Sequence, residues 1–327
     1  MLALFKQKAP GTIAILFITA LLLKLPLFSH PALVRTATDG PLFRSLAAWL
    51  QAGSPLYAGI LAFVLLFVGA VMVNYVVNEY RMTARQTFLP ALAFLLITSL
   101  VPEWSLLSAP LVSSLLLLVA FSQCLHLYAA SRANGRIFNI GLLTGLAGFF
   151  FVPSLFFGVL ALICLAVLRP FRVNEVLMLL LGVLTPTYFW AVYLFLTDAF
   201  TWKALVPVLD FGIIERRPTY TLLASIVLLL APFLMGSYYV QVNLRKMLIQ
   251  ARKNWSLLLF YLLLAFGMPF FNNGGQYTGW VLLAPPLAAF HACAFLYPPR
   301  RWSPLLLFFV ILLYILALQY GIGMMRK

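Results

Sequence analysis

Long apolar runs separated by short polar segments fill almost the whole chain. A helix of about 20 apolar residues crosses the ~30 Å hydrocarbon core of a bilayer. The runs therefore predict an all-α, polytopic transmembrane helix bundle with about 11 spans, or roughly 9 to 11 because one short pair is ambiguous. The expected spans are 10–29, 56–78, 87–101, 109–130, 138–152, 154–168, 175–197, 219–242, 254–271, 279–297 and 303–324.

The ambiguous pair lies at residues 138–168, an uncharged stretch that is too long for one vertical span. Pro153 lacks an N–H and disfavours helix at the residue before it, so two short helices should meet at Val152 and Pro153. Each half reaches only ~22 Å, which fits either a thin hairpin or a re-entrant pair. Gly141 and Gly145 have the small-x-x-x-small spacing that lets membrane helices approach closely.

Composition agrees with this pattern. The 327 residues are 64% hydrophobic and 9% charged, whereas soluble domains carry about 25% charged residues. We therefore expect a single integral membrane domain over residues 1–327, with loops 29–55 and 198–218 carrying most of the structure outside the membrane. Residues 39–50 in the first loop predict an amphipathic surface helix with Asp39 as its N-cap.

The net charge of +15 would suggest nucleic acid for a soluble protein, but basic residues of a membrane protein belong at its cytoplasmic face. We therefore expect no nucleic acid. A cytoplasmic N-terminus places fourteen of the 22 Lys and Arg residues inside and seven outside, with Lys24 in the first span. The inside set is Lys6, Lys8, Arg81, Arg85, Arg132, Arg136, Arg169, Arg172, Arg245, Lys246, Arg252, Lys253, Arg300 and Arg301.

Neither cysteine nor histidine spacing predicts a metal site. The three cysteines lie far apart in apolar spans, and the three histidines have no ligand spacing to another His, Cys or acid. We therefore predict no metal ligands.

Asp39 is the first candidate catalytic residue. It could act as a general base or a metal ligand at the outer surface, with Arg35 and Arg44 beside it. The alternative is a helix N-cap with two basic neighbours.

A second polar cluster stands just before the span at 219–242. Arg216 and Arg217 could bind a phosphate group by charge-assisted hydrogen bonds, or could pair with the outer-face acids Asp210 and Glu215 on a solvated loop. Lys24 could face a lipid phosphate, or could snorkel to the head groups.

The outer loop at 272–278 is rich in hydrogen-bonding groups. Asn272, Asn273 and Gln276 could contact a polar acceptor substrate, or could simply form a tight turn.

Three stretches carry a resemblance to a known group of proteins: TFLPALAFLLITS (87–99), FNIGLLTGLAGFFFVPSLFF (138–157) and LRPFRVNEVLMLLLGVLTPTYF (168–189). They resemble an uncharacterised family of Bacteroidota polytopic membrane proteins, which implies the bacterial inner membrane. Members are sometimes labelled carotene monooxygenases. The sequence has no His cluster for non-haem iron, so that label finds no support.

The layout is also similar to the GT-C class of membrane glycosyltransferases. These enzymes take a sugar from a polyprenyl-phosphate carrier and use an acidic residue in the first outer loop, near amphipathic helices. Asp39 matches that position, although Gly40 stands where many such enzymes have a second acid. The resemblance implies Asp39 as the base, with Lys24, Arg35, Arg44, Arg216 and Arg217 around the carrier phosphate. Such a transfer requires no cofactor and is compatible with a divalent cation.

Two other functions stay open. One is a non-catalytic subunit or scaffold of an envelope assembly or secretion machine, with envelope proteins as partners. The other is a lipid or solute transporter or flippase. Ion-coupled transporters usually place charges at mid-membrane and many carriers have inverted repeats, and the sequence has neither feature clearly.

Overall fold

The computed structural model describes residues 2–7, 9, 11–29, 31–34, 39–128, 130, 133–205, 219–271, 277–300 and 302–321. Within these ranges every regular element is a helix. The extended pairings among the described residues are isolated bridges between Leu33 and Leu107 and between Asp39 and Phe151. The predicted all-α class is therefore confirmed for the described part of the chain.

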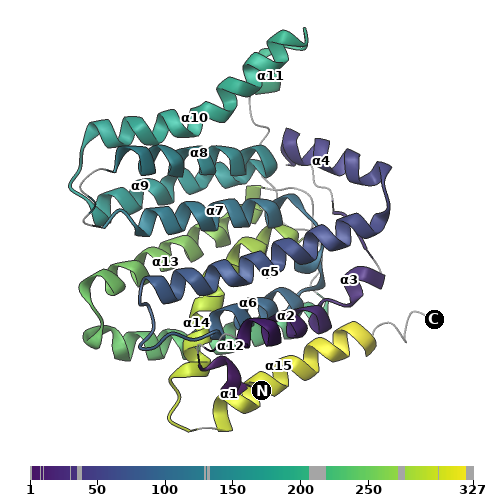
Figure 1. Ribbon diagram of the computed structural model, residues 1–327, viewed down its shortest axis with the longest axis vertical. Helices are drawn as coiled ribbons and strands as arrows, with labels where there is room; N and C mark the ends of the chain where they lie inside the picture. The colour runs from purple at the N-terminus through teal and green to yellow at the C-terminus, as the bar shows by residue number, and fades with distance from the viewer. Residues whose placement is uncertain are drawn as a thin grey trace.

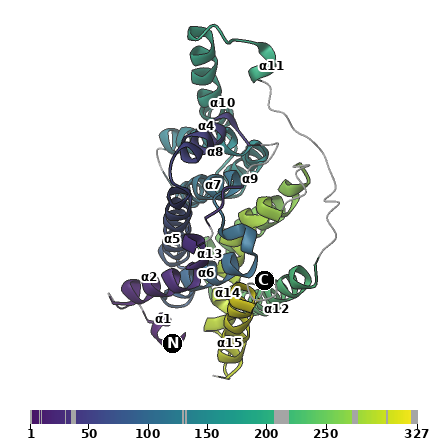
Figure 2. The same ribbon diagram turned by 90° about the vertical axis from the view of Figure 1, so that its right-hand side faces the viewer.

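The long helices lie side by side, with α10 at one edge of the bundle and α15 at the other (Figure 1). Figure 2 shows the bundle from the end at which α4 and α11 lie. The α-helices are α1 (Leu2–Phe5), α2 (Thr12–Leu23), α3 (Pro26–Ser29), α4 (Pro41–Ala52), α5 (Pro55–Glu79), α6 (Leu89–Leu100), α7 (Ala109–Leu125), α8 (Asn134–Phe150), α9 (Phe157–Leu168), α10 (Val173–Leu196), α11 (Trp202–Leu205), α12 (Tyr220–Asn243), α13 (Ile249–Gly267), α14 (Ala284–Leu296) and α15 (Trp302–Leu316). Short 3₁₀ or π segments complete the framework: η1 (Pro102–Ser105), η2 (Val152–Phe156), η3 (Leu244–Lys246), η4 (Met268–Phe271), η5 (Tyr277–Leu283) and η6 (Ala317–Gly321).

Five of the described helices are long and apolar enough to cross a membrane, as expected of a membrane protein. They are Pro55–Glu79, Val173–Leu196, Tyr220–Lys246, Tyr277–Leu296 and Trp302–Gln319. Shorter apolar helices at Thr12–Leu23, Leu89–Leu100, Ala109–Leu125 and Val152–Leu168 pack among them.

The centre of the bundle is formed by α6 and α14, in which every residue is buried. In Tyr277–Leu296, 89% of the apolar stretch is buried, against 22% in Val173–Leu196. The first stretch is therefore enclosed by other helices, while most of the second is not covered by the rest of the described chain.

The break predicted at Pro153 is confirmed. Helix α8 ends at Phe150, η2 holds Pro153, and α9 begins at Phe157. Arg169, at the end of α9, donates from Nη1 to the carbonyl oxygen of Ala130, 2.6 Å away. The end of α9 therefore lies next to the segment that precedes α8.

The small-residue face of α8 packs against α10. A Cβ built on Gly141 would collide with the carbonyl oxygen of Leu179, and one on Gly145 would approach the carbonyl oxygen of Val183 to 2.5 Å. Gly182 on α10 faces back and meets Gly141. Backbone therefore touches backbone, as the spacing of the glycines predicts.

The predicted amphipathic helix after Asp39 is present as α4. Phe43, Ala47 and Leu50 are buried at helical spacing, and Arg44 lies on the exposed face. The N-cap assignment of Asp39 is wrong, because Gly40 occupies the N-cap and makes no side-chain capping bond. Pro41 at the first helical position fixes the start of the helix one residue later than expected.

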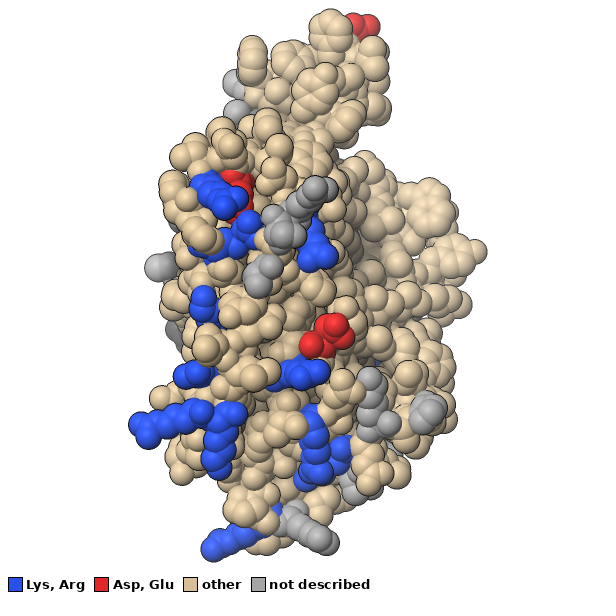
Figure 3. Space-filling view, turned by 60° about the vertical axis from the view of Figure 1, so that its left-hand side comes forward, with Lys and Arg blue, Asp and Glu red and all other residues tan. Residues whose placement is uncertain are grey.

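Basic residues gather on one face of the bundle. The turns after α5, α7, α9, α12 and α14 lie at the same end, on the left in Figure 1. Figure 3 brings this side forward and shows Lys and Arg spread over it. The turns contribute Arg81, Arg85, Arg169, Arg172, Lys246 and Arg300. The structure thus groups residues that the charge arithmetic assigned to one side; we call this surface the basic face.

Candidate functional site

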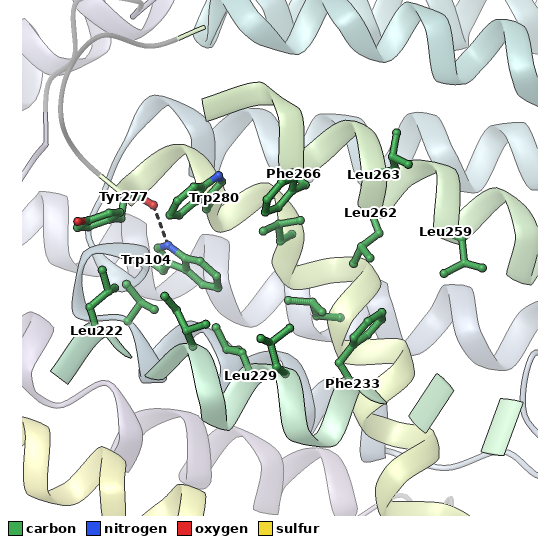
Figure 4. Close-up of a pocket in the computed structure, with 15 residues that line it drawn as sticks. Trp104, Leu222, Leu229, Phe233, Leu259, Leu262, Leu263, Phe266, Tyr277 and Trp280 are labelled. Atoms are coloured by element: carbon green, nitrogen blue, oxygen red, sulfur yellow. Dashed lines mark hydrogen bonds between the residues drawn. The ribbon is translucent and has the colours of Figure 1, made fainter. Parts of the chain in front are cut away.

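A groove with a volume of about 540 Å³ runs between α12 and α13, at the side of the bundle. Leu229 and Phe233 of α12 face Leu262 of α13 across it, and η1, η5 and α14 close its remaining walls (Figure 4). All fifteen residues that line it are apolar or aromatic. A cavity of this size lies within the range of small-molecule sites, about 300–1,000 Å³.

One end of the groove is a fixed aromatic cluster of Trp104, Tyr277 and Trp280. The indole Nε1 of Trp104 donates to the carbonyl oxygen of Tyr277 at 2.8 Å. The backbone N–H of Tyr277 donates to Oε2 of Glu103 at 2.9 Å. The rings of Tyr277 and Trp280 stack with their centroids 5.7 Å apart. These contacts tie η1 to η5, so this end of the groove has a defined shape.

The groove is open along its side. Leu230 on α12 and Leu263 and Phe266 on α13 line it and are exposed at the same time. Because α12 belongs to a stretch able to cross a membrane, an opening edged by such residues would face hydrocarbon rather than water. Such an opening would be accessible from the side to an apolar chain.

Lys24 stands behind the aromatic end and is 1% exposed. Its Nζ donates to Oγ1 of Thr98 at 3.1 Å and to Oγ of Ser105 at 2.6 Å. Ser105 follows Trp104 in η1, so Lys24 supports the segment that carries the groove's aromatic cluster. Its role in phosphate binding stays a prediction.

Asp39 lies elsewhere and is 2% exposed. It forms the bridge to Phe151, and the next residue, Gly40, donates from its backbone N–H to the carbonyl oxygen of Phe150 at 2.8 Å. A Cβ on Gly40 would collide with the carbonyl oxygen of Phe149, so the chain here crosses directly over the end of α8. Asp39 is not among the residues that line the groove.

The remaining predicted site residues fall outside the described residues: Arg35, Asp210, Glu215, Arg216, Arg217, Asn272, Asn273 and Gln276. Their place along the chain is informative nevertheless. Residues 206–218 lead into α12, whose first turns contribute Leu222 to the groove. Residues 272–276 lead into η5, whose first residue, Tyr277, lines the aromatic end.

The sequence does not predict the groove, because most of its lining residues are apolar side chains inside expected spans. Two signals pointed toward it. Trp104 and Trp280 stand near the ends of expected spans, and a polar segment precedes both α12 and η5. Among the described residues, no three His, Cys, Asp or Glu side chains converge as a metal site would require.

Comparison with known proteins identifies a family for this chain. No curated protein and no solved structure resembles the chain significantly. A family model covers residues 47–326, from the second half of α4 to the C-terminal end. Since the match spans most of the sequence, the chain belongs to this family of unknown function, DUF6427.

Proposed function

We propose that this protein binds the hydrocarbon chain of a membrane lipid in the groove between α12 and α13. The observation that carries the proposal is the wholly apolar groove, open along an exposed apolar edge and closed at one end by Trp104, Tyr277 and Trp280. Trp and Tyr favour the level of the lipid head groups. The head group would therefore lie at the aromatic end, with the chain running along α12 toward Phe233.

Apolar contact alone would select no particular lipid, because the bilayer that the lipid leaves is as apolar as the groove. Selectivity must come from the head group. The predicted phosphate-binding residues Arg216 and Arg217 and the predicted acceptor residues Asn272, Asn273 and Gln276 stand in the two segments that lead into the walls of the groove. We propose that these segments supply the polar contacts.

The finer proposal is that the lipid is the polyprenyl-phosphate sugar donor of a GT-C-like glycosyltransferase. In that reaction the acceptor hydroxyl oxygen attacks the anomeric carbon and the bond from this carbon to the phosphate oxygen breaks. Polyprenyl phosphate leaves with the electron pair, and Asp39 takes the acceptor proton. Cations near the phosphate stabilise the charge that develops on it. The support is the position of Asp39, followed by the amphipathic α4 in an all-helical bundle.

The orientation belongs to the same proposal. About 11 crossings in the bacterial inner membrane, with the N-terminus in the cytoplasm, would place the basic face inside, as the positive-inside rule favours. The aromatic end of the groove and α4 would then meet the periplasm.

The burial of Asp39 favours a second candidate, a non-catalytic subunit of an envelope assembly machine that holds the same lipid. A general base must come within hydrogen-bonding reach of the proton that it accepts. A catalytic Asp39 would therefore have to be uncovered and brought to the head group in the reacting state, because it does not line the groove.

Blocking the groove tests the main proposal. Leu263→Trp places a large side chain at the groove's open edge, where Leu263 is 67% exposed, and Leu313→Trp on α15 is the matched control at 64% exposed. Native mass spectrometry of protein purified in mild detergent should find lipid on the wild type and on Leu313→Trp but not on Leu263→Trp. Equal lipid retention by all three proteins would refute the groove as its site.

Turnover of a polyprenyl-phosphate-linked sugar separates the two candidates. If the protein is the enzyme, Asp39→Asn should retain lipid and lose turnover. A wild type that retains lipid without turning it over supports the non-catalytic subunit. Full turnover by Asp39→Asn and by an Arg216→Ala, Arg217→Ala double variant would end the enzymatic proposal.

A further inference from the structure

The turn between α5 and α6, at the basic face, is fixed by hydrogen bonds. The side chain of Asn78 clamps Thr87: its Nδ2 donates to the carbonyl oxygen at 2.9 Å, and its Oδ1 accepts from the backbone N–H at 3.1 Å. Trp255 of α13 donates from Nε1 to the carbonyl oxygen of Met82 at 2.9 Å. The hydroxyl of Tyr297 accepts from the backbone N–H of Ala84 at 3.0 Å. The turn therefore has a defined shape. The positive-inside rule requires only that basic residues be present at this face and does not account for that shape.

Arg81 occupies a backbone position in this turn that normally takes glycine. The N–H of Met82 donates to the carbonyl oxygen of Val77, and that of Arg81 donates to the carbonyl oxygen of Asn78. These two bonds define a Schellman motif, in which the residue at the position of Arg81 is left-handed and usually glycine. Arg81 has φ of 47°. Strain of this kind at a non-glycine residue is grounds for seeking a function of its side chain.

Beside the turn lies a cavity of about 460 Å³, which we call the basic cavity. Four parts of the chain form it: the end of α5, the turn itself, the turn between α12 and α13, and the end of α14. Arg81 and Arg85 line it from one side and Lys246 from another. None of its lining residues is an acid, and Glu79, the nearest acid along the chain, is not among them.

The lining also offers neutral hydrogen-bonding groups, which include Asn243 and Tyr297. Burial raises the pKa of the Tyr297 hydroxyl. The hydroxyl therefore keeps its proton and can donate it while it accepts from Ala84. Cations from two parts of the chain on one cavity, together with neutral donors, suit a compact, multiply charged anion.

We propose that the basic cavity binds a phosphate group. Arg81 and Arg85 would donate to its oxygens through their guanidinium groups, and Lys246 would add a third positive charge. The chemistry is the same whether the group belongs to the head group of an anionic lipid or to a phosphorylated compound in solution. The proposal stands independently of the lipid groove, which lies between α12 and α13 and shares no lining residue with the basic cavity.

Two binding measurements distinguish the sources. In the first, detergent-purified protein in phosphate-free buffer is titrated with inorganic phosphate, with sodium chloride at matched ionic strength as the reference, because salt screens non-specific attraction. In the second, the protein is placed in phosphatidylcholine nanodiscs with or without added phosphatidic acid, and the phosphatidic acid that the protein retains is measured. Saturable binding in the first measurement identifies a soluble source. Retention of phosphatidic acid without a response to inorganic phosphate identifies a lipid head group.

Arg81→Gly is the decisive variant, because glycine suits the left-handed position and leaves the turn intact while the cation is removed. Lys246→Ala, on a different element, is the second. Each should weaken phosphate binding at least about tenfold, as the loss of one charge-assisted contact implies. Arg172→Ala removes a charge from the basic face without touching the cavity and should change binding less than about twofold. No saturable binding in either measurement, or an equal loss in Arg172→Ala, would overturn the proposal.

Discussion

The contact between α8 and α10 gives the sharpest test of the packing. A Cβ on Gly182 would collide with the carbonyl oxygen of Phe138 and would lie 2.9 Å from the backbone nitrogen of Leu142. Both are backbone atoms, so no change of rotamer can relieve the overlap and the helices themselves must separate. Gly158 on α9 is the matched control, since a Cβ there meets nothing within 4 Å.

Two contributions to the free energy of unfolding of Gly182→Ala have opposite signs. Overpacking at Gly182→Ala costs about 1–3 kcal/mol, offset in part by about 1 kcal/mol of gained helix propensity. The net destabilisation should reach up to about 2 kcal/mol, or a fall in Tm of up to roughly 3 °C for a chain of this size. Gly158→Ala gains propensity without a clash and should raise Tm slightly.

The assay can use the protein's own thiols. Cys124, Cys164 and Cys293 are free and buried, so a thiol-reactive fluorescent dye reports their exposure as the detergent-solubilised protein is heated. A Tm for Gly182→Ala that equals or exceeds that of Gly158→Ala would refute the close backbone approach of α8 and α10.

Three further variants test other parts of the structure by the same thermal assay. In phosphate-free buffer, Arg81→Gly should be more stable than wild type by about 0.5–1 kcal/mol, because relief of the left-handed strain exceeds the added chain entropy. Arg252→Gly, at an exposed position inside α13, should be less stable than wild type by about 1 kcal/mol, and the reverse order of the two variants would exclude strain at Arg81. Lys24→Ala should destabilise by about 1–3 kcal/mol because it removes the two hydrogen bonds from Nζ to Thr98 and Ser105 and leaves a cavity beside them, and an unchanged Tm would contradict that network. Arg169→Ala should cost about 3–5 kcal/mol because Glu175, paired at 2.9 Å and 5% exposed, is left buried and unpaired. Adding Glu175→Gln should recover part of this loss, and no recovery would show that the pair is not coupled.

The sequence was most informative where a residue changes the backbone locally. Pro153 places the break between α8 and α9, and the spacing of Gly141 and Gly145 predicts a close helix contact. Hydropathy identifies apolar helices, but it cannot tell α14, enclosed on all sides, from α10, which is mostly uncovered. That distinction depends on which helices surround an element, and no local pattern encodes it.

The candidate site was harder to predict, because its parts are ordinary in isolation. Asp39 attracts notice as an acid in an outer loop, yet its burial against Phe151 follows from a crossing over α8 that the sequence does not reveal. The groove is formed by apolar side chains that would serve equally well in a core. The basic cavity depends on Arg81 and Lys246 lining the same space, although more than 150 residues separate them in the sequence.

The full enclosure of α14 has a consequence for biogenesis. A helix without a lipid-facing side has no stable resting place at the periphery and must be covered by its neighbours as it arrives. α6 and α12 are synthesised before it and α15 after it, and all three contact it. A chain truncated before α15 would therefore leave one flank of α14 bare, and such fragments should be substrates for membrane quality-control proteases.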